Sequence, residues 1–138
     1  MSPIPARLRR LVRERADGRC EYCLLAQAGQ EATFHVDHVV PIAARGPTLA
    51  DNLALACVSC SLHKGARRSA ADPTSGRTVA LFHPRRQRWD AHFRWEGSRV
   101  LGNSPTGRAT AALLRMNRPV VLAIRSEEAL RGRHPPER

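Results

Sequence analysis

The stretch from His35 to Pro41, His-Val-Asp-His-Val-Val-Pro, places three titratable side chains in a segment that otherwise has the composition of a buried β-strand. Valine favours strands, and Pro41 removes a backbone donor and therefore marks the end of the strand. Burying His35, Asp37 and His38 costs desolvation free energy unless each group has a partner or a task. Imidazole and carboxylate groups accept protons and bind metal ions, so this stretch is a candidate site for either chemistry.

The four cysteines form a second reactive set, two Cys-x-x-Cys pairs made by Cys20 with Cys23 and Cys57 with Cys60. Two intervening residues let both thiolates of a pair bind one ion, and two pairs complete a tetrahedral Zn²⁺ site. The alternative is a pair of disulfides, which a reducing compartment and the strain of a bond within Cys-x-x-Cys disfavour. We therefore expect a structural zinc that supplies much of the folding free energy and leaves residues 35–38 free for a second task.

Composition favours a polyanionic partner. The chain has 138 residues, typical of one domain, with 23 basic and 12 acidic residues and a formal net charge of +11. A GC-rich genome would explain why 22 of the basic residues are arginine, but not the shortage of acidic residues. Charge alone also suits a ribosomal or membrane-surface protein. The sequence has no apolar run of transmembrane length and no signal peptide, so we expect a cytoplasmic protein without a membrane partner.

The first half of the chain predicts a small set of elements around these residues. Leu8, Leu11 and Val12 recur at helical spacing, so residues 5–16 predict an amphipathic helix. A strand over 32–40, a partner strand near 53–56 and a short helix over 57–66 follow. Residues 67–77 are rich in turn-forming residues and mark a boundary.

The second half predicts a strand within 78–84, a helix that begins at Pro84, and a hairpin over 92–102 in which Phe93 and Trp95 alternate. Two further helices begin at Pro105, after Ser104 as N-cap, and at Pro119. We thus divide the chain into an N-terminal helix (1–19), a core (20–66), a basic extension that packs on the core (67–134) and a disordered tail (135–138).

The cysteine pairs, the Asp-His ahead of Val-Val-Pro, the Asn52-Leu ahead of the second pair and the following Lys64 together resemble the HNH endonuclease family. The form in question has a ββα-metal core, or His-Me finger, braced by a four-cysteine zinc site. Residues 81–97 and 105–117 also resemble the C-terminal extension of small standalone bacterial HNH proteins. The resemblance implies an α+β fold with a C-terminal α/β extension, and metal-dependent hydrolysis of phosphodiester bonds, mainly in DNA.

The resemblance also implies roles for individual residues. His38 is the general base that takes a proton from the attacking water, as a neutral imidazole can near pH 7. Asn52 holds the loop that carries this histidine. Asp37 binds a divalent ion (Mg²⁺, Mn²⁺, Ni²⁺ or Zn²⁺) that stabilises the phosphate and the leaving oxygen. Because neighbouring strand residues point to opposite sides, either the strand bends near its end or water and phosphate lie between Asp37 and His38.

One position departs from the family pattern. Many members have histidine or asparagine directly after the last zinc cysteine, where this chain has Ser61, a weaker ligand. His63 lies about 200° around a helix from Ser61 by the 3.6-residue period and does not simply replace it. Three outcomes stay open: an ion held by Asp37, His63 and water, an ion held weakly through Ser61, or a damaged site.

The remaining candidates concern nucleic-acid contact. His35 is either structural or an accessory neighbour of a phosphate, and the aromatic residues of the second half form a small core. The residues expected to contact phosphates are Lys64, Arg67, Arg68, Arg85 and Arg86. Two alternative functions remain: a zinc-braced nucleic-acid-binding module with weak or no activity, and a structural partner in a larger assembly.

Overall fold

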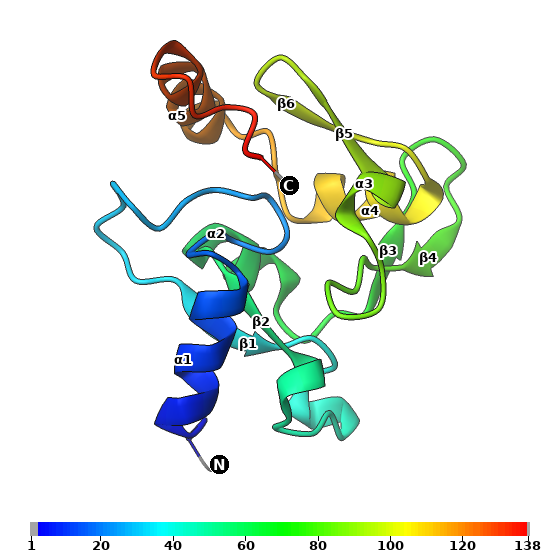
Figure 1. Ribbon diagram of the computed structural model, residues 1–138. Coiled ribbons are helices and arrows are strands. Elements are labelled where there is room, and N and C mark those ends of the chain that lie inside the picture. The colour runs from blue at the N-terminus through cyan, green and yellow to red at the C-terminus, as the bar shows by residue number, and fades with distance from the viewer. Residues whose placement is uncertain (1–2, 138) are drawn as a thin grey trace. The chain divides into compact units, whose positions relative to one another are not determined.

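The computed structural model describes residues 3–137, and its elements are mixed helices and short antiparallel strands, which confirms the predicted α+β class (Figure 1). The described chain forms two compact units. Unit 1 contains residues 3–68 and 83–87, and unit 2 contains residues 69–82 and 88–137. The chain therefore crosses from one unit to the other three times.

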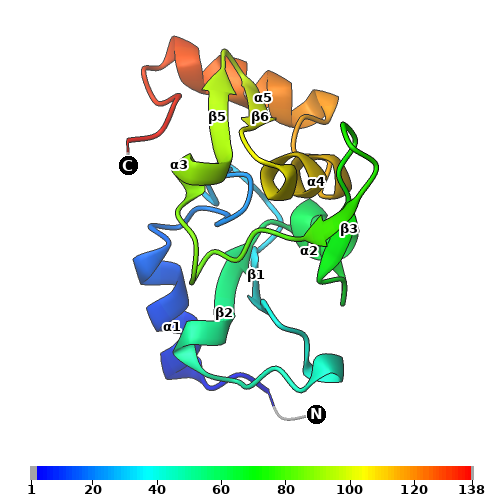
Figure 2. The same cartoon turned by 90° about the vertical axis from the view of Figure 1, so that its right-hand side faces the viewer.

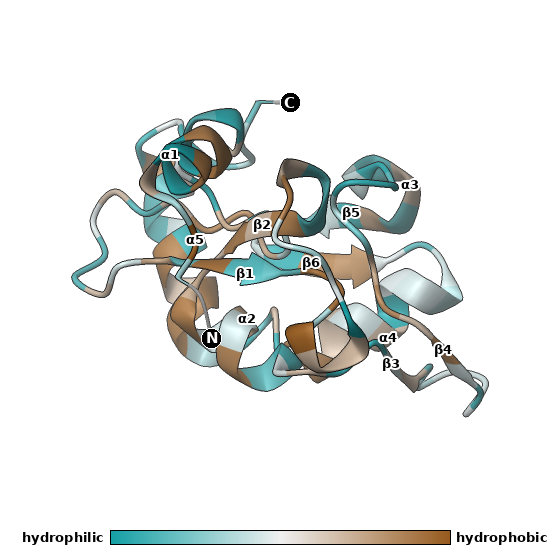
Figure 3. Ribbon diagram, turned by 90° about the horizontal axis from the view of Figure 1, so that it is seen from below, coloured by the Kyte–Doolittle hydropathy of each residue, from teal (hydrophilic) through white to brown (hydrophobic). Residues whose placement is uncertain are grey.

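In unit 1, an antiparallel strand pair lies between two helices (Figures 2 and 3). Strand β1 (His35–His38) pairs with β2 (Leu53–Ala56), with His35 opposite Ala56 and His38 opposite Leu53. Helix α1 (Ala6–Arg15) and helix α2 (Val58–Lys64) pack against these strands. All four residues of β2 are buried, so this strand forms the centre of the unit. These elements confirm the predicted order of helix, two strands and helix.

The connection from β1 to β2 folds back on itself. It contains two 3₁₀ turns, η1 (Ile42–Ala44) and η2 (Ala50–Asn52). At Gly46 the backbone lies so close to β1 that an added Cβ would be 1.7 Å from the carbonyl oxygen of Val40. Glycine is required there for steric reasons, and the loop is kept close to the end of the strand.

Unit 2 is built from two hairpins and three helices. Its strands are β3 (Ser69–Ala71), β4 (Thr78–Ala80), β5 (Phe93–Glu96) and β6 (Arg99–Gly102), paired β3 with β4 and β5 with β6. Its helices are α3 (Trp89–His92), α4 (Pro105–Leu113) and α5 (Pro119–Leu130). The predicted cap of α4 is confirmed, because the Ser104 hydroxyl accepts a hydrogen bond of 3.0 Å from the Gly107 amide. The predicted β5–β6 hairpin is confirmed as well.

The core of unit 2 includes the aromatic cluster that the sequence predicted. Phe93 packs edge-on against Phe82 with ring centroids 5.2 Å apart, and against Trp89 at 5.0 Å. These three rings are buried, whereas Trp95 is half-buried beside the guanidinium group of Arg125. The rings therefore stabilise the unit, as aromatic pairs do when their surface is removed from water.

Two local expectations were wrong. Residues 69–71, expected as part of a turn segment, form β3, because the turn residues after Asp72 close a hairpin with β4. The helix expected from Pro84 begins only at Trp89, since residues 84–87 form a turn in which the His83 amide donates to the Gln87 side chain at 2.8 Å. Of the expected disordered tail, residues 135–137 have no helix or strand and Arg138 lies outside the described residues.

None of the helices within residues 3–137 has the length and apolar character needed to cross a bilayer.

Candidate functional site

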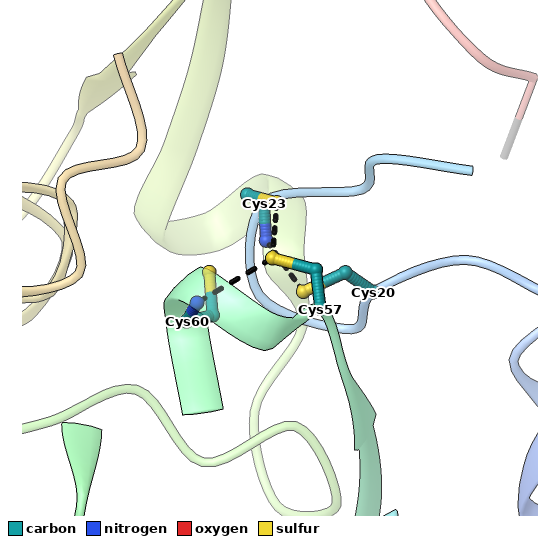
Figure 4. Close-up of side chains that lie close together, drawn as sticks. All are labelled: Cys20, Cys23, Cys57 and Cys60. Carbon is teal, nitrogen blue, oxygen red and sulfur yellow. Dashed lines mark hydrogen bonds between the residues drawn. The ribbon is translucent and has the colours of Figure 1, made fainter. Parts of the chain in front are cut away.

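The four cysteines lie together in unit 1 (Figure 4). Each of them is at most 2% exposed. Their sulfur atoms all lie within 4.8 Å of one another, and all four thiols are free of disulfides. Cys20 and Cys23 lie on the turn after α1, whereas Cys57 caps α2 and Cys60 lies in its first turn. The Cys57 sulfur accepts a hydrogen bond from the Cys60 amide at 3.4 Å, and the Cys20 sulfur accepts one from the Cys23 amide at 3.5 Å.

This donor set fits a closed tetrahedral site for a zinc-type ion. Burial raises the pKa of the Cys20 thiol, and hydrogen bonds from Cys20 and the other thiols lower the pKa of Cys57. Four neighbouring buried thiols do not ionise together without a cation, and a shared divalent ion supplies the compensating charge. The predicted cluster of the two cysteine pairs is confirmed. Because it joins the turn after α1 to the start of α2, an ion bound there would have a structural role.

Glu21, between the two cysteines of the first pair, joins this turn to the rest of unit 1. Its carboxylate accepts a hydrogen bond of 2.9 Å from the Leu55 amide in β2 and forms an ion pair with Arg85. Both side chains are largely buried, 11% and 16% exposed, and burial lowers the pKa of Arg85 to about 10. Arg85 thus has an internal partner, and its expected phosphate contact stays a prediction.

His38, the last residue of β1, points to a hydroxyl group of the following loop. Its Nε2 atom lies 2.8 Å from Oγ1 of Thr48. Asn52 holds this loop with three hydrogen bonds: Oδ1 accepts from the Val40 amide at 2.9 Å, and Nδ2 donates to the carbonyl oxygens of Val40 at 3.0 Å and Pro47 at 2.9 Å. The sequence carried no signal for Thr48, because a loop threonine has no distinctive spacing.

His35 and Asp37 occupy the alternate positions of β1, on the face opposite to His38. The Nδ1 atom of His35 lies 2.9 Å from Oγ of Ser61 in α2. One helical turn later, the Lys64 ammonium group donates to the Val39 carbonyl oxygen at 3.0 Å. Burial lowers the pKa of Lys64, and the negative charge of Asp37 opposes this shift. His35, Asp37, Ser61 and Lys64 therefore share the region where β1 meets α2.

His63 is on another side of α2. Its Nδ1 atom lies 2.8 Å from the carbonyl oxygen of Ser59 and 3.1 Å from the Ser59 hydroxyl, within its own helix. Its neighbour Leu62 is 71% exposed, so this part of the helix faces solvent. The structure brings Ser61 to His35, and the role of His63 as a metal ligand stays a prediction.

The predicted phosphate contacts differ in how accessible they are. Lys64 is only 4% exposed, so its contact with a phosphate also stays a prediction. Arg67, Arg68 and Arg86 are exposed cations of unit 1. His83, which the sequence did not single out, lies near charged groups, and its pKa is lowered by burial and then by Arg86 and Lys64.

Comparison with known proteins relates part of unit 1 to a protein family. Neither the curated proteins nor the solved structures give a match to the chain. The family model described as HNH endonuclease matches residues 20–67. This range contains both cysteine pairs, strands β1 and β2 and helix α2, in the order ββα. Residues 20–67 of this chain are therefore similar to the HNH endonuclease family.

Proposed function

We propose that the protein is a metal-dependent endonuclease that hydrolyses phosphodiester bonds in nucleic acid, and in DNA foremost. The observation that carries the proposal is the match to the HNH endonuclease family over the segment that contains Asp37, His38 and Asn52. The excess of basic residues agrees with a polyanionic substrate. We also infer a cytoplasmic location, which fits four cysteines that bind metal rather than form disulfides.

His38 is proposed as the general base. Donation of its Nε2 proton to the Thr48 hydroxyl, 2.8 Å away, would leave Nδ1 as the basic nitrogen that accepts a proton from water. Asn52 acts on His38 indirectly, because its hydrogen bonds to Val40 and Pro47 fix the loop that carries Thr48. Thr48 and Asn52 are therefore positioning residues.

Asp37 is proposed as the carboxylate ligand of a divalent ion. Oxygen and imidazole donors suit Mg²⁺, Mn²⁺, Ni²⁺ and Zn²⁺, and the neighbouring donors on the same face of β1 and on α2 are His35 and Ser61. When bound, such an ion supplies Lewis-acid stabilisation of the phosphate and of the leaving oxygen. His35 is nearer to this face than His63, whose Nδ1 is bonded within its own helix.

The basic residues of unit 1 are proposed to bind the substrate backbone. Arg67, Arg68 and Arg86 are exposed and can pair with phosphate oxygens as planar, bidentate donors. Lys64 has a different role, because its ammonium group donates a hydrogen bond to the Val39 carbonyl oxygen and is attracted by the negative charge of Asp37. It would hold β1 against α2 at the level of the carboxylate.

Cleavage of supercoiled plasmid with Mg²⁺, Mn²⁺ or Ni²⁺ tests the proposal, with wild type compared with His38→Ala. We expect wild type to nick or cut the plasmid and His38→Ala to lose about 10²–10⁴-fold in rate. His92→Ala is the matched control, because His92 is also bonded to a hydroxyl, that of Ser104 at 2.6 Å, but lies in unit 2. Equal rates for wild type and His38→Ala would refute the role of the base.

Ser61 favours a second candidate function, a zinc-braced nucleic-acid-binding module with weak or no activity. A serine hydroxyl binds divalent ions less strongly than imidazole or an amide oxygen. Under this alternative, the protein binds nucleic acid with a steep salt dependence but does not cleave with any of the three ions. Gain of cleavage in Ser61→His would then identify the weak ligand as the cause.

A further inference from the structure

Unit 2 contains a groove of its own, which the HNH segment does not include. It has a volume of about 580 Å³ and is lined by eleven residues from the β3–β4 turn, β6, α4, the turn between α4 and α5, and the start of α5. Three of these residues are arginines, Arg108, Arg115 and Arg118, and none of the eleven is acidic. We call this feature the arginine groove.

The backbone around the arginine groove is fixed by close packing and by hydrogen bonds. At the β6–α4 contact, a Cβ on Gly102 would lie 2.3 Å from the Arg108 amide nitrogen, so the two backbones touch. Asn117 accepts from the Val100 amide at 2.8 Å and donates to the Val100 carbonyl oxygen at 2.8 Å. Asn117 therefore anchors the turn between α4 and α5, which carries Arg115 and Arg118, to strand β6.

The three arginines differ in their electrostatic state. Arg108 donates from Nε and Nη2 to the two carboxylate oxygens of the fully buried Asp72, each at 2.9 Å, so its charge is compensated. Arg115 is exposed and Arg118 is half-buried. Within residues 3–137, no ion pair joins either of them to a carboxylate. The arginine groove thus presents two uncompensated cations beside apolar walls that include Leu101 and Pro119.

We propose that the arginine groove binds the sugar–phosphate backbone of nucleic acid, as a second contact outside the HNH domain. Guanidinium groups bind phosphate oxygens through parallel N–H donors. Apolar walls lower the local dielectric and strengthen the field of the two cations, and they accept the sugar and base edges of a strand. The choice of nucleic acid, rather than an acidic protein, rests on the proposed function.

Salt-dependent binding tests this groove without catalysis. The probe is a fluorescein-labelled duplex of about 20 base pairs, titrated from about 50 to 200 mM NaCl without added divalent ions. For Arg115→Gln/Arg118→Gln we expect about 10-fold weaker binding and a log–log salt slope reduced by about 2, one for each lost phosphate contact. Arg131→Gln/Arg133→Gln is the matched control, because it removes the same charge from side chains paired with Glu127 and Glu128. This control should leave the slope unchanged.

A second measurement keeps the inference testable if the double variant folds poorly. A photo-crosslinking p-benzoylphenylalanine replaces Ala112, which is exposed and lines the arginine groove, and Leu130, which is 85% exposed and is not among its lining residues. We expect crosslinks to DNA from position 112 and few from position 130. Equal salt slopes for both double variants, equal crosslinking, or binding of the groove to an acidic protein in place of DNA would overturn the inference.

The outcome is separable from that of the proposed function. Binding that depends on Arg115 and Arg118 in a protein that never cleaves would refute the nuclease and retain the groove. Cleavage by a protein whose DNA affinity does not change when Arg115 and Arg118 are replaced would support the nuclease and refute the groove.

Discussion

The Nδ1 atom of His35 lies 2.9 Å from Oγ of Ser61, and this contact joins the first residue of β1 to the middle of α2. The contact places the imidazole of His35 beside position 61, where the HNH family pattern has histidine or asparagine, which bind metal ions more strongly than serine. Asp37, two residues along β1, faces the same side of the strand. An imidazole, a hydroxyl and a carboxylate therefore lie in one region, while His63 is bonded to Ser59.

The first prediction concerns the ligands of the divalent ion. We expect His35→Ala to lower the affinity of zinc-loaded protein for Mn²⁺ by about 10-fold, and Ser61→His to raise it by a similar factor, because each change removes or adds an imidazole donor. Electron paramagnetic resonance of free Mn²⁺ measures both. His63→Ala is the control and should change nothing, and a larger effect of His63→Ala than of His35→Ala would contradict the assignment.

The second prediction isolates Thr48. Thr48→Val keeps the shape of the side chain but removes the hydroxyl bonded to His38. We expect kcat for plasmid nicking to fall about 10-fold with KM unchanged, because the imidazole loses its orientation while substrate contacts remain. Ser59→Ala removes the hydroxyl beside His63 in the same way and should leave kcat unaltered. Equal losses in the two variants would argue against a specific role of Thr48.

The third prediction compares two asparagines that make the same interaction. Asn52 bonds the amide and carbonyl of Val40, and Asn117 bonds those of Val100. Each Asn→Ala variant leaves buried backbone groups without partners and should lower the free energy of unfolding by about 1–3 kcal/mol. Chemical denaturation measures this loss. At saturating substrate, only Asn52→Ala should lower kcat, and a similar loss in Asn117→Ala would mean that stability alone explains the effect.

The fourth prediction concerns the cysteine cluster. We expect one tightly bound zinc-type ion per chain, and removal of that ion should unfold unit 1, since structural zinc contributes on the order of 10 kcal/mol to small domains. Hydrogen exchange should show loss of protection in β2 and α2, with protection retained in α4. Re-addition of Zn²⁺ should restore the protection. Full protection of β2 in the metal-free protein would show that the ion is dispensable.

The fifth prediction concerns pH and Asp72. Hydrogen bonds from Arg108 hold the pKa of this carboxyl well below its usual range. A lowered pKa in the folded state contributes stability above the unfolded value of about 3.9, and this stability is lost as the pH falls toward the folded value. Asp72→Asn should therefore lower the melting temperature of unit 2 at pH 7.

In the same experiment, the difference between wild type and Asp72→Asn should shrink as the pH falls below about 4. Thermal unfolding followed by circular dichroism measures it at each pH. A difference that is constant from pH 7 to pH 2 would show that the effect of the substitution does not come from the charge of Asp72.

Much of the fold followed from local signals. The spacing of the cysteines predicted their cluster, and Ser104 followed by Pro105 predicted the start of α4, because metal ligation and capping depend on nearby residues. Strand β3 was missed because it is three residues long and owes its pairing to the turn beyond Asp72. A short strand with alanine and serine has little propensity of its own.

The candidate site was less predictable than the fold. Periodicity correctly separated His63 from Ser61 around α2, but it gave no reason to expect His35 beside Ser61, since that contact depends on how β1 packs against α2. The partner of Arg85 was hidden for the same reason. A basic residue in a turn looks like a phosphate contact unless the sequence reveals a buried carboxylate such as Glu21.

The ion pair of Glu21 with Arg85 has a consequence for how this protein can be divided. Residues 83–87 belong to unit 1 although unit 2 precedes and follows them in the chain. A truncation after residue 68 would thus remove Arg85, the cation that pairs with Glu21 in the turn that carries the first cysteine pair. A graft of the first unit into another scaffold would have to include residues 83–87 as a separate insertion. The two units are interleaved in the gene, so recombination at a single crossover point cannot exchange one without damaging the other.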